Sequence, residues 1–126
     1  MTVRLGRVQP LRELLTDIGN LKIDEEEAAG WLFLPRDKQW TLESPAVLLE
    51  LNEVPPGTEN VEDVETPELA KREKLKCILL GVDVQGIIDN ARQQKPNVDL
   101  DEIFSAVLYY YEFDAYKDMS GPMNRS

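Results

Sequence analysis

The stretch from Asp99 to Tyr116, DLDEIFSAVLYYYEFDAY, constrains the fold most, because it carries both a helix-start signature and a helical apolar stripe. Asp99 can cap the free N–H groups of a first turn, and Glu102, three residues later, can reach back to complete a capping box. Apolar residues then follow the i, i+3, i+4, i+7 spacing of a core-facing helix. The inward stripe is predicted to hold Leu100, Ile103, Phe104, Val107, Leu108 and Tyr111.

The same stretch carries an aromatic and acidic outer edge. A second stripe runs through Ala106, Tyr109, Phe113 and Tyr116, with Glu112 and Asp114 nearby. Tyrosine is enriched among the residues that dominate binding interfaces. We therefore expect a partner-binding surface made by Tyr109, Glu112, Phe113, Asp114 and Tyr116. The alternative interpretation is a helix buried on most of its circumference.

The rest of the chain alternates helix and strand signals. Apolar periodicity and turn residues predict helices at 8–19 and 83–94, with Gly19 as a C-cap, Asp83 as an N-cap and a helical turn near 24–30. Strands are predicted at 31–34, 40–42, 46–52 and 75–82. This order predicts a two-layer α+β domain, in which about three helices cover a small, mainly antiparallel sheet of three to four strands. One domain is expected at 1–118, followed by a flexible tail at 119–126.

The charge balance limits the classes of partner. Fourteen basic residues against 24 acidic ones give a net charge of -10. Binding to nucleic acid or anionic lipid needs clustered Lys and Arg, so the composition predicts neither as a partner and instead favours a basic protein. The absence of a long apolar run or signal-peptide pattern, together with a single cysteine, predicts a cytoplasmic protein.

A second acidic region lies in the segment 54–70, which is predicted to be an exposed loop because it has three prolines, a glycine and few strongly apolar residues. Between Lys38 and Lys71 there are eight acids and no Lys or Arg. Glu59, Glu62, Asp63 and Glu65 form a candidate second patch for a cationic partner surface. The alternative interpretation is a solvated loop kept extended by its charges.

The sequence offers little for catalysis. It contains no histidine, which removes the commonest general base and transition-metal ligand. Cys77 lies in an apolar strand pattern and is predicted to be buried and inert. Asp99, Asp101 and Glu102 lack the spacing of a calcium loop and are interpreted as capping residues. We therefore expect no enzyme, no metal and no cofactor.

Three quoted segments carry a resemblance to known proteins: WLFLP, PAVLLELNE and the C-terminal LLGVDVQGIIDNARQQ…LDEIFSAVLYYYEFDAY. Together they resemble a family of small, uncharacterised bacterial proteins. In that family a tryptophan-containing strand precedes a helix with a Leu-Tyr-Tyr-Tyr stretch and an Asp-Ala-aromatic ending, here 108–111 and 114–116. In general class the chain is also similar to immunity proteins of contact-dependent inhibition and polymorphic-toxin systems, which are small acidic cytoplasmic domains.

That likeness implies a non-enzymatic domain that neutralises a cognate basic toxin, often a nuclease, by blocking its active site. Two alternatives stay open: a DNA-mimic inhibitor such as a phage anti-defence protein, and a small hydrolase or ligand-binding domain that uses carboxylates alone. An exposed strand edge at Trp31–Leu34 would also support a homodimer.

Overall fold

The computed structural model describes residues 5–21, 27–36 and 39–119. Residues 24–26 of the predicted helical turn and 120–126 of the predicted tail lie outside the described residues, and residues 27–30 form no helix. In chain order the elements are β1 (Gln9–Pro10), α1 (Leu11–Gly19), β2 (Trp31–Pro35), β3 (Pro45–Leu49), α2 (Val61–Glu65), α3 (Glu68–Arg72), β4 (Leu75–Leu80), α4 (Gly81–Gln94) and α5 (Leu100–Phe113).

The four strands form one antiparallel sheet with the order β1-β3-β2-β4, which confirms the predicted α+β class. β2 and β3 are interior and carry runs of buried residues, as expected for strands covered on both faces. The exposed strand edge expected at Trp31–Leu34 is therefore wrong, because β2 pairs with a strand on each side. β4 pairs with β2 alone among the described strands, so it forms one edge of the sheet. The pairing shifts register between Leu32 and Phe33, where β4 contains one extra residue.

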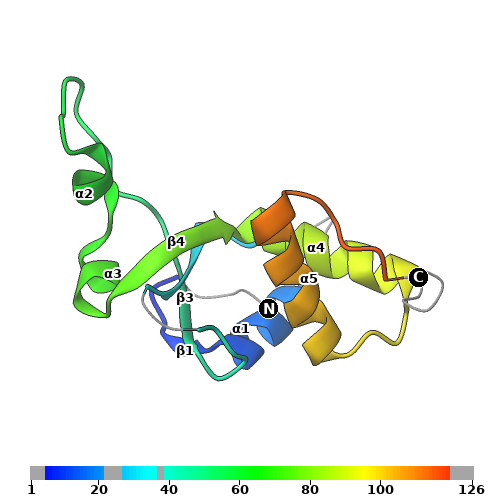
Figure 1. Cartoon of the computed structure of the whole chain (residues 1–126). Helices are drawn as coiled ribbons and strands as arrows, with labels where there is room; N and C mark the ends of the chain where they lie inside the picture. The colour runs from blue at the N-terminus through cyan, green and yellow to red at the C-terminus, as the bar shows by residue number, and fades with distance from the viewer. Residues whose placement is uncertain (1–4, 22–26, 37–38, 120–126) are drawn as a thin grey trace.

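The larger core lies between one sheet face and the helices α1, α4 and α5 (Figure 1). Leu32 and Leu48 point into it from the sheet, and Leu14, Ile88 and Val107 meet them from the three helices. All five side chains are almost completely buried. This layer is the two-layer packing that the helical stripes predicted.

The opposite face carries a second, smaller core that the sequence did not predict. Phe33, Val47 and Leu75 pack there against Ala70 of α3. Alternation along β2 explains the division, because Phe33 points to this face while its neighbours Leu32 and Leu34 point to the other. The predicted acidic loop therefore contains two short helices, α2 and α3, and α3 is packed onto the sheet (Figure 1).

Several predicted boundaries are wrong for local reasons. The first helix starts at Leu11, because Gln9 and Pro10 pair with β3 instead. Residues 40–42 form no strand, and Gly19 is a helical residue followed by Asn20 in a right-handed conformation. α4 starts at Gly81, with Leu80 rather than Asp83 as its N-cap residue, and the N–H of Gly81 donates to the carbonyl of Gly30 at 2.8 Å.

The start of α5 is confirmed in detail, but its end is not. The N–H of Glu102 donates to Asp99 Oδ1 at 2.9 Å, and the N–H of Asp99 donates to Glu102 Oε1 at 3.0 Å, which completes the capping box. The helix ends at Phe113 because Asp114 adopts a left-handed conformation, with φ of 56°. Tyr116 thus lies beyond the helix.

Candidate functional site

The C-terminal end of α5 exposes a pair of aromatic rings. Tyr109 and Phe113 are one helical turn apart, and their ring centroids lie 4.6 Å apart. Their exposed fractions are 36% and 58%, and Glu112 and Asp114 beside them are also exposed. The pair is therefore in mutual contact on the surface.

The other aromatic residues of this region point elsewhere. After the left-handed turn at Asp114 the chain folds back, and the Tyr116 ring packs on Tyr110 with centroids 5.6 Å apart. Burial raises the pKa of Tyr110, and the nearby charges of Asp83 and Asp114 raise it further. Tyr116 is half exposed, at 51%. It extends the exposed surface toward α4, but not along the helical stripe that the sequence predicted.

Two residues of α5 lie opposite to their predicted sides. Ala106, assigned to the outer stripe, is buried, whereas Tyr111, assigned to the core, is 40% exposed. Tyr111 makes an edge contact with Trp40, with ring centroids 5.3 Å apart, and Lys76 Nζ lies 5.9 Å from the Tyr111 centroid. Tyr111 therefore faces Trp40 and Lys76 outside the larger core, although its spacing matches that of the core-facing residues of α5.

The second predicted patch lies on and before α2. Glu59, Glu62 and Asp63 are exposed, and Glu65 is half-buried. Asp63 Oδ1 lies 3.3 Å from Lys71 Nζ, so this carboxylate forms an ion pair within the chain.

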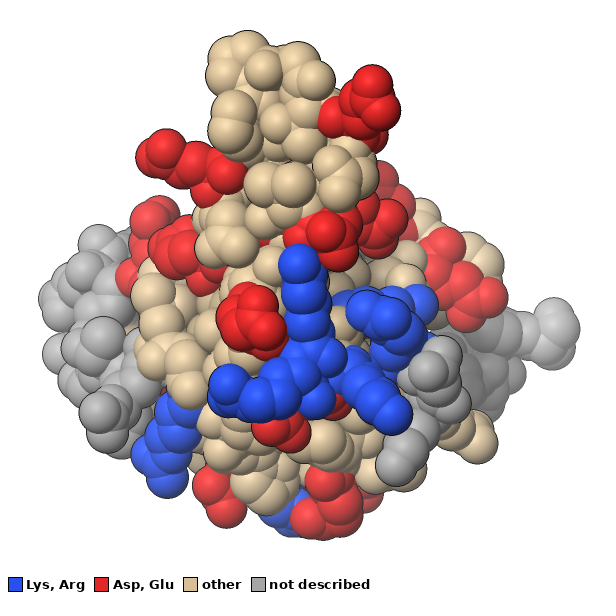
Figure 2. All heavy atoms as spheres, turned by 90° about the vertical axis from the view of Figure 1, so that its left-hand side faces the viewer, with Lys and Arg blue, Asp and Glu red and all other residues tan. Residues whose placement is uncertain are grey.

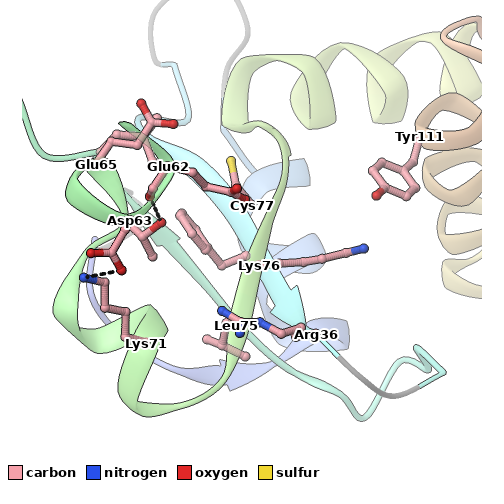
Figure 3. Close-up of a pocket in the computed structure, with 12 residues that line it drawn as sticks. Arg36, Glu62, Asp63, Glu65, Lys71, Leu75, Lys76, Cys77 and Tyr111 are labelled. Carbon is pink, nitrogen blue, oxygen red and sulfur yellow. Dashed lines mark hydrogen bonds and ion pairs between the residues drawn. The ribbon is translucent and has the colours of Figure 1, made fainter. Parts of the chain in front are cut away.

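A cavity of about 680 Å³ lies beside these acids (Figure 3). Its lining residues come from β2, β4, α5 and the segment 51–71: Phe33, Arg36, Leu51, Glu62, Asp63, Glu65, Thr66, Lys71, Leu75, Lys76, Cys77 and Tyr111. Figure 3 shows the three acids on one side of β4, while Lys76 extends from the other side toward Tyr111. The cavity therefore joins an acidic wall, an apolar floor and a basic wall.

The structure does not bring the two predicted patches together. Glu62, Asp63 and Glu65 share the cavity with Tyr111, but no predicted α5 site residue lines it. The two patches are separate surfaces.

A basic cluster beside the cavity was missed by the sequence reasoning. Figure 2 shows Lys and Arg side chains gathered in the middle of one face, with acidic residues around them. The cluster comprises Arg36, which follows β2, together with Lys71 and Arg72 of α3, Lys74 just before β4, and Lys76 of β4. All five are exposed. The available signal was the run KREKLK at 71–76, with four basic residues in six.

Cys77 also differs from its prediction, because it is exposed rather than buried. Partial burial, together with the nearby charge of Glu65, raises the pKa of the Cys77 thiol to about 11. Because the thiolate is the nucleophile, this raised pKa agrees with the predicted low reactivity.

Within residues 5–21, 27–36 and 39–119, no three side chains of Cys, Asp or Glu are grouped as metal ligands. The described helices include none with the length and apolarity that crossing a membrane requires.

The chain is a small α+β domain with a two-sided antiparallel sheet, an aromatic surface on α5 and, apart from it, a cavity lined by both acidic and basic residues. Its residues 8–119 match the family described as a domain of unknown function (DUF7716), and the chain belongs to that family. This agrees with the resemblance to an uncharacterised family, although the family description says nothing about immunity. No curated protein and no solved structure shows significant similarity to the chain.

Proposed function

We propose that this protein is a non-enzymatic binding domain that recognises a basic partner protein through Tyr109, Glu112, Phe113, Asp114 and Tyr116. The observation that carries this proposal is the exposed contact pair of Tyr109 and Phe113. Two rings that already touch have little freedom left to lose on binding, so they form a preorganised anchor. The carboxylates of Glu112 and Asp114 beside them suit a basic rim on the partner.

The specific role we propose is that of an immunity protein that covers the active site of a basic toxin domain. The net charge of -10 would accelerate the encounter with such a partner. Glu59, Glu62, Asp63 and Glu65 would form a second contact, with carboxylates in place of substrate phosphates. Because Asp63 is paired with Lys71, we expect Glu59 and Glu62 to contribute more than Asp63 to this contact.

The proposal is tested by affinity capture from a lysate of the source cell. Three forms of the protein serve as bait: the wild type, Phe113→Ala and Tyr111→Ala. Tyr111 is the matched control, since it is an exposed aromatic residue of α5 that faces Trp40 and Lys76 instead. Wild type and Tyr111→Ala should retain one stoichiometric basic polypeptide whose activity they inhibit. Phe113→Ala should lose about 2 kcal/mol of binding free energy, roughly a 30-fold weakening. No retained polypeptide, or equal retention by all three forms, would refute the proposal.

The DNA-mimic alternative predicts a different response. A phosphate-like row of carboxylates would bind with a steep dependence on salt and would tolerate Phe113→Ala. The ion pair of Asp63 with Lys71 interrupts the acidic row on α2, so the geometry favours the aromatic anchor.

A further inference from the structure

The chain folds back over α4 after α5 ends. Asp114 adopts a left-handed conformation, and its N–H donates to the carbonyl of Tyr110 at 2.7 Å, which closes the last turn of the helix. The following residues run along α4 toward the C-terminal end of that helix (Figure 1). We call residues 114–119 the strap. All of them are exposed or half-buried, so hydrogen bonds and ring contacts, rather than a fully buried side chain, fix the course of the strap.

The side chain of Gln94, the last residue of α4, fastens the end of the strap. Its Nε2 donates to the carbonyl of Lys117 at 2.9 Å, and its Oε1 accepts from the N–H of Met119 at 2.8 Å. The same Nε2 also donates to Asn90 Oδ1 at 2.7 Å, which orients the amide group. Gln94 thus offers the strap one donor and one acceptor, as the backbone of a neighbouring strand would.

Tyr116 lies between two fixed points of the strap. Asp114 is bonded to α5 on one side. On the other side Lys117 is held by α4 and by its own Nζ, which donates to Ser105 Oγ. The Tyr116 ring packs on Tyr110 and is still half exposed. An exposed side chain whose neighbours are fixed has little conformational freedom left to lose when a partner covers it.

Gly86 of α4 leaves room for the Tyr116 hydroxyl group. A Cβ atom at Gly86 would lie 3.1 Å from that oxygen, which is tighter than an ordinary van der Waals contact. Gly86 is in the interior of the helix, where glycine is less favourable than alanine because it loses more conformational freedom on folding. The glycine therefore weakens α4 at the point that Tyr116 approaches. Exceptions of this kind to local helix preference are expected at functional sites.

We propose that the strap positions Tyr116 for partner binding, and that Gln94 and Gly86 of α4 are the positioning residues. The partner would meet Tyr116 in the place that α4 gives it, rather than on a freely moving segment. This inference rests on the proposed function, because it concerns how one of the proposed partner-binding residues is held. It adds two residues of α4 to a surface that the sequence placed on α5 alone.

The first test compares Gln94→Ala with Gln93→Ala. Gln93 is the matched control, since it is the neighbouring exposed glutamine and donates to Asp89 within α4 instead. In the free protein the amide of Met119 should exchange with solvent faster in Gln94→Ala and at the wild-type rate in Gln93→Ala. The binding probe is the basic polypeptide that the wild type captures. Gln94→Ala should bind it roughly tenfold more weakly, because the strap must then be ordered on binding, and Gln93→Ala should bind it as the wild type does.

The second test uses Gly86→Ala to separate positioning from stability. Alanine should raise Tm because it favours the helix. It should nevertheless weaken binding roughly threefold, because its Cβ displaces the Tyr116 hydroxyl group. A strap with a merely structural role would raise Tm without a loss of binding.

Tyr116→Phe supplies the control for the second test. It removes the oxygen that the new Cβ would meet and keeps the ring that packs on Tyr110. Gly86→Ala should therefore cause no further loss of binding when it is added to Tyr116→Phe. The double-mutant cycle would then show that the two positions are coupled.

The outcomes distinguish this inference from the proposed function. If the wild type retains no basic polypeptide, the proposed function fails and the inference fails with it. If Phe113→Ala loses the polypeptide but Gln94→Ala binds it as tightly as the wild type, only the positioning role is overturned. Unchanged exchange at Met119 in Gln94→Ala would show that this side chain does not hold the strap. An equal loss from Gly86→Ala with and without the Tyr116 hydroxyl group would overturn the role of Gly86.

Discussion

At the scale of single residues, the edge position of β4 explains the exposure of Cys77. The thiol lies on the face that carries the smaller core, which is covered by α3 only near Ala70 and Leu75. Past the bulge, Ile78 and Leu79 both pack against the larger core. Cys77 is thus left between the two packed regions, near Glu65, which disfavours its thiolate.

We predict slow alkylation of Cys77 by iodoacetamide at pH 8. With a pKa of about 11 the thiolate is scarce at this pH, and the rate should rise nearly tenfold per pH unit up to pH 10. Glu65→Gln should speed the reaction at pH 8, because it removes a negative charge that opposes ionisation. The single cysteine makes the rate measurable by mass spectrometry of the intact protein. A rate equal to that of free glutathione at pH 8 would contradict the raised pKa.

At the scale of single elements, α5 is determined most clearly at its first turn. The capping box satisfies two backbone donors, and Lys95 donates to Glu102 Oε2 from the preceding segment. That hydrogen bond from Lys95 is the largest cause of the lowered pKa of Glu102, followed by the backbone hydrogen bond with Asp99. A lowered folded-state pKa stabilises the fold above the pKa of the unfolded state, and this contribution is lost as the pH falls through the folded-state pKa.

Asp99→Ala should lower the free energy of unfolding by about 1 kcal/mol, the usual loss for an N-cap. Asp101→Ala is the matched control, since Asp101 is an exposed acid of the same turn outside the capping box. Its effect should be only a few tenths of a kcal/mol, from the helix dipole. Urea denaturation followed by circular dichroism at pH 7 measures both variants. Equal losses would show that charge in the first turn matters, rather than the cap.

At the scale of the whole molecule, the sheet separates two cores of unequal size. The larger one joins α1, α4 and α5 to Leu32, Leu34 and Leu48. The smaller one holds α3 through Ala70 and Leu75. The acidic segment before α3 extends from this smaller core, away from the helical layer (Figure 1). Because few buried contacts hold the region 61–72, we expect it to open before the rest of the molecule.

Leu75→Ala should therefore raise hydrogen exchange in residues 61–72 more than in α1, α4 or α5. Ile87→Ala in α4 is the control, because Ile87 is equally buried in the larger core. Both variants should lose about 2–5 kcal/mol of stability as large-to-small core changes. Only Leu75→Ala should favour local opening at 61–72, and identical exchange patterns would show that the two cores unfold as one unit.

Local pattern by itself determined the α+β class, the approximate positions of β2, β3, β4, α4 and α5, and the capping box at Asp99. These features depend on residues within a few positions of one another, so the spacing of apolar residues and caps is sufficient. The exposure of Tyr109, Phe113 and Tyr116 was one of two interpretations that the pattern allowed. Only the tertiary structure decided that Tyr111 is exposed, that α3 covers the second sheet face, and that β4 is an edge strand. Strand order and the coverage of each face arise from contacts between distant segments, and helical or strand periodicity carries no information about which neighbour is present.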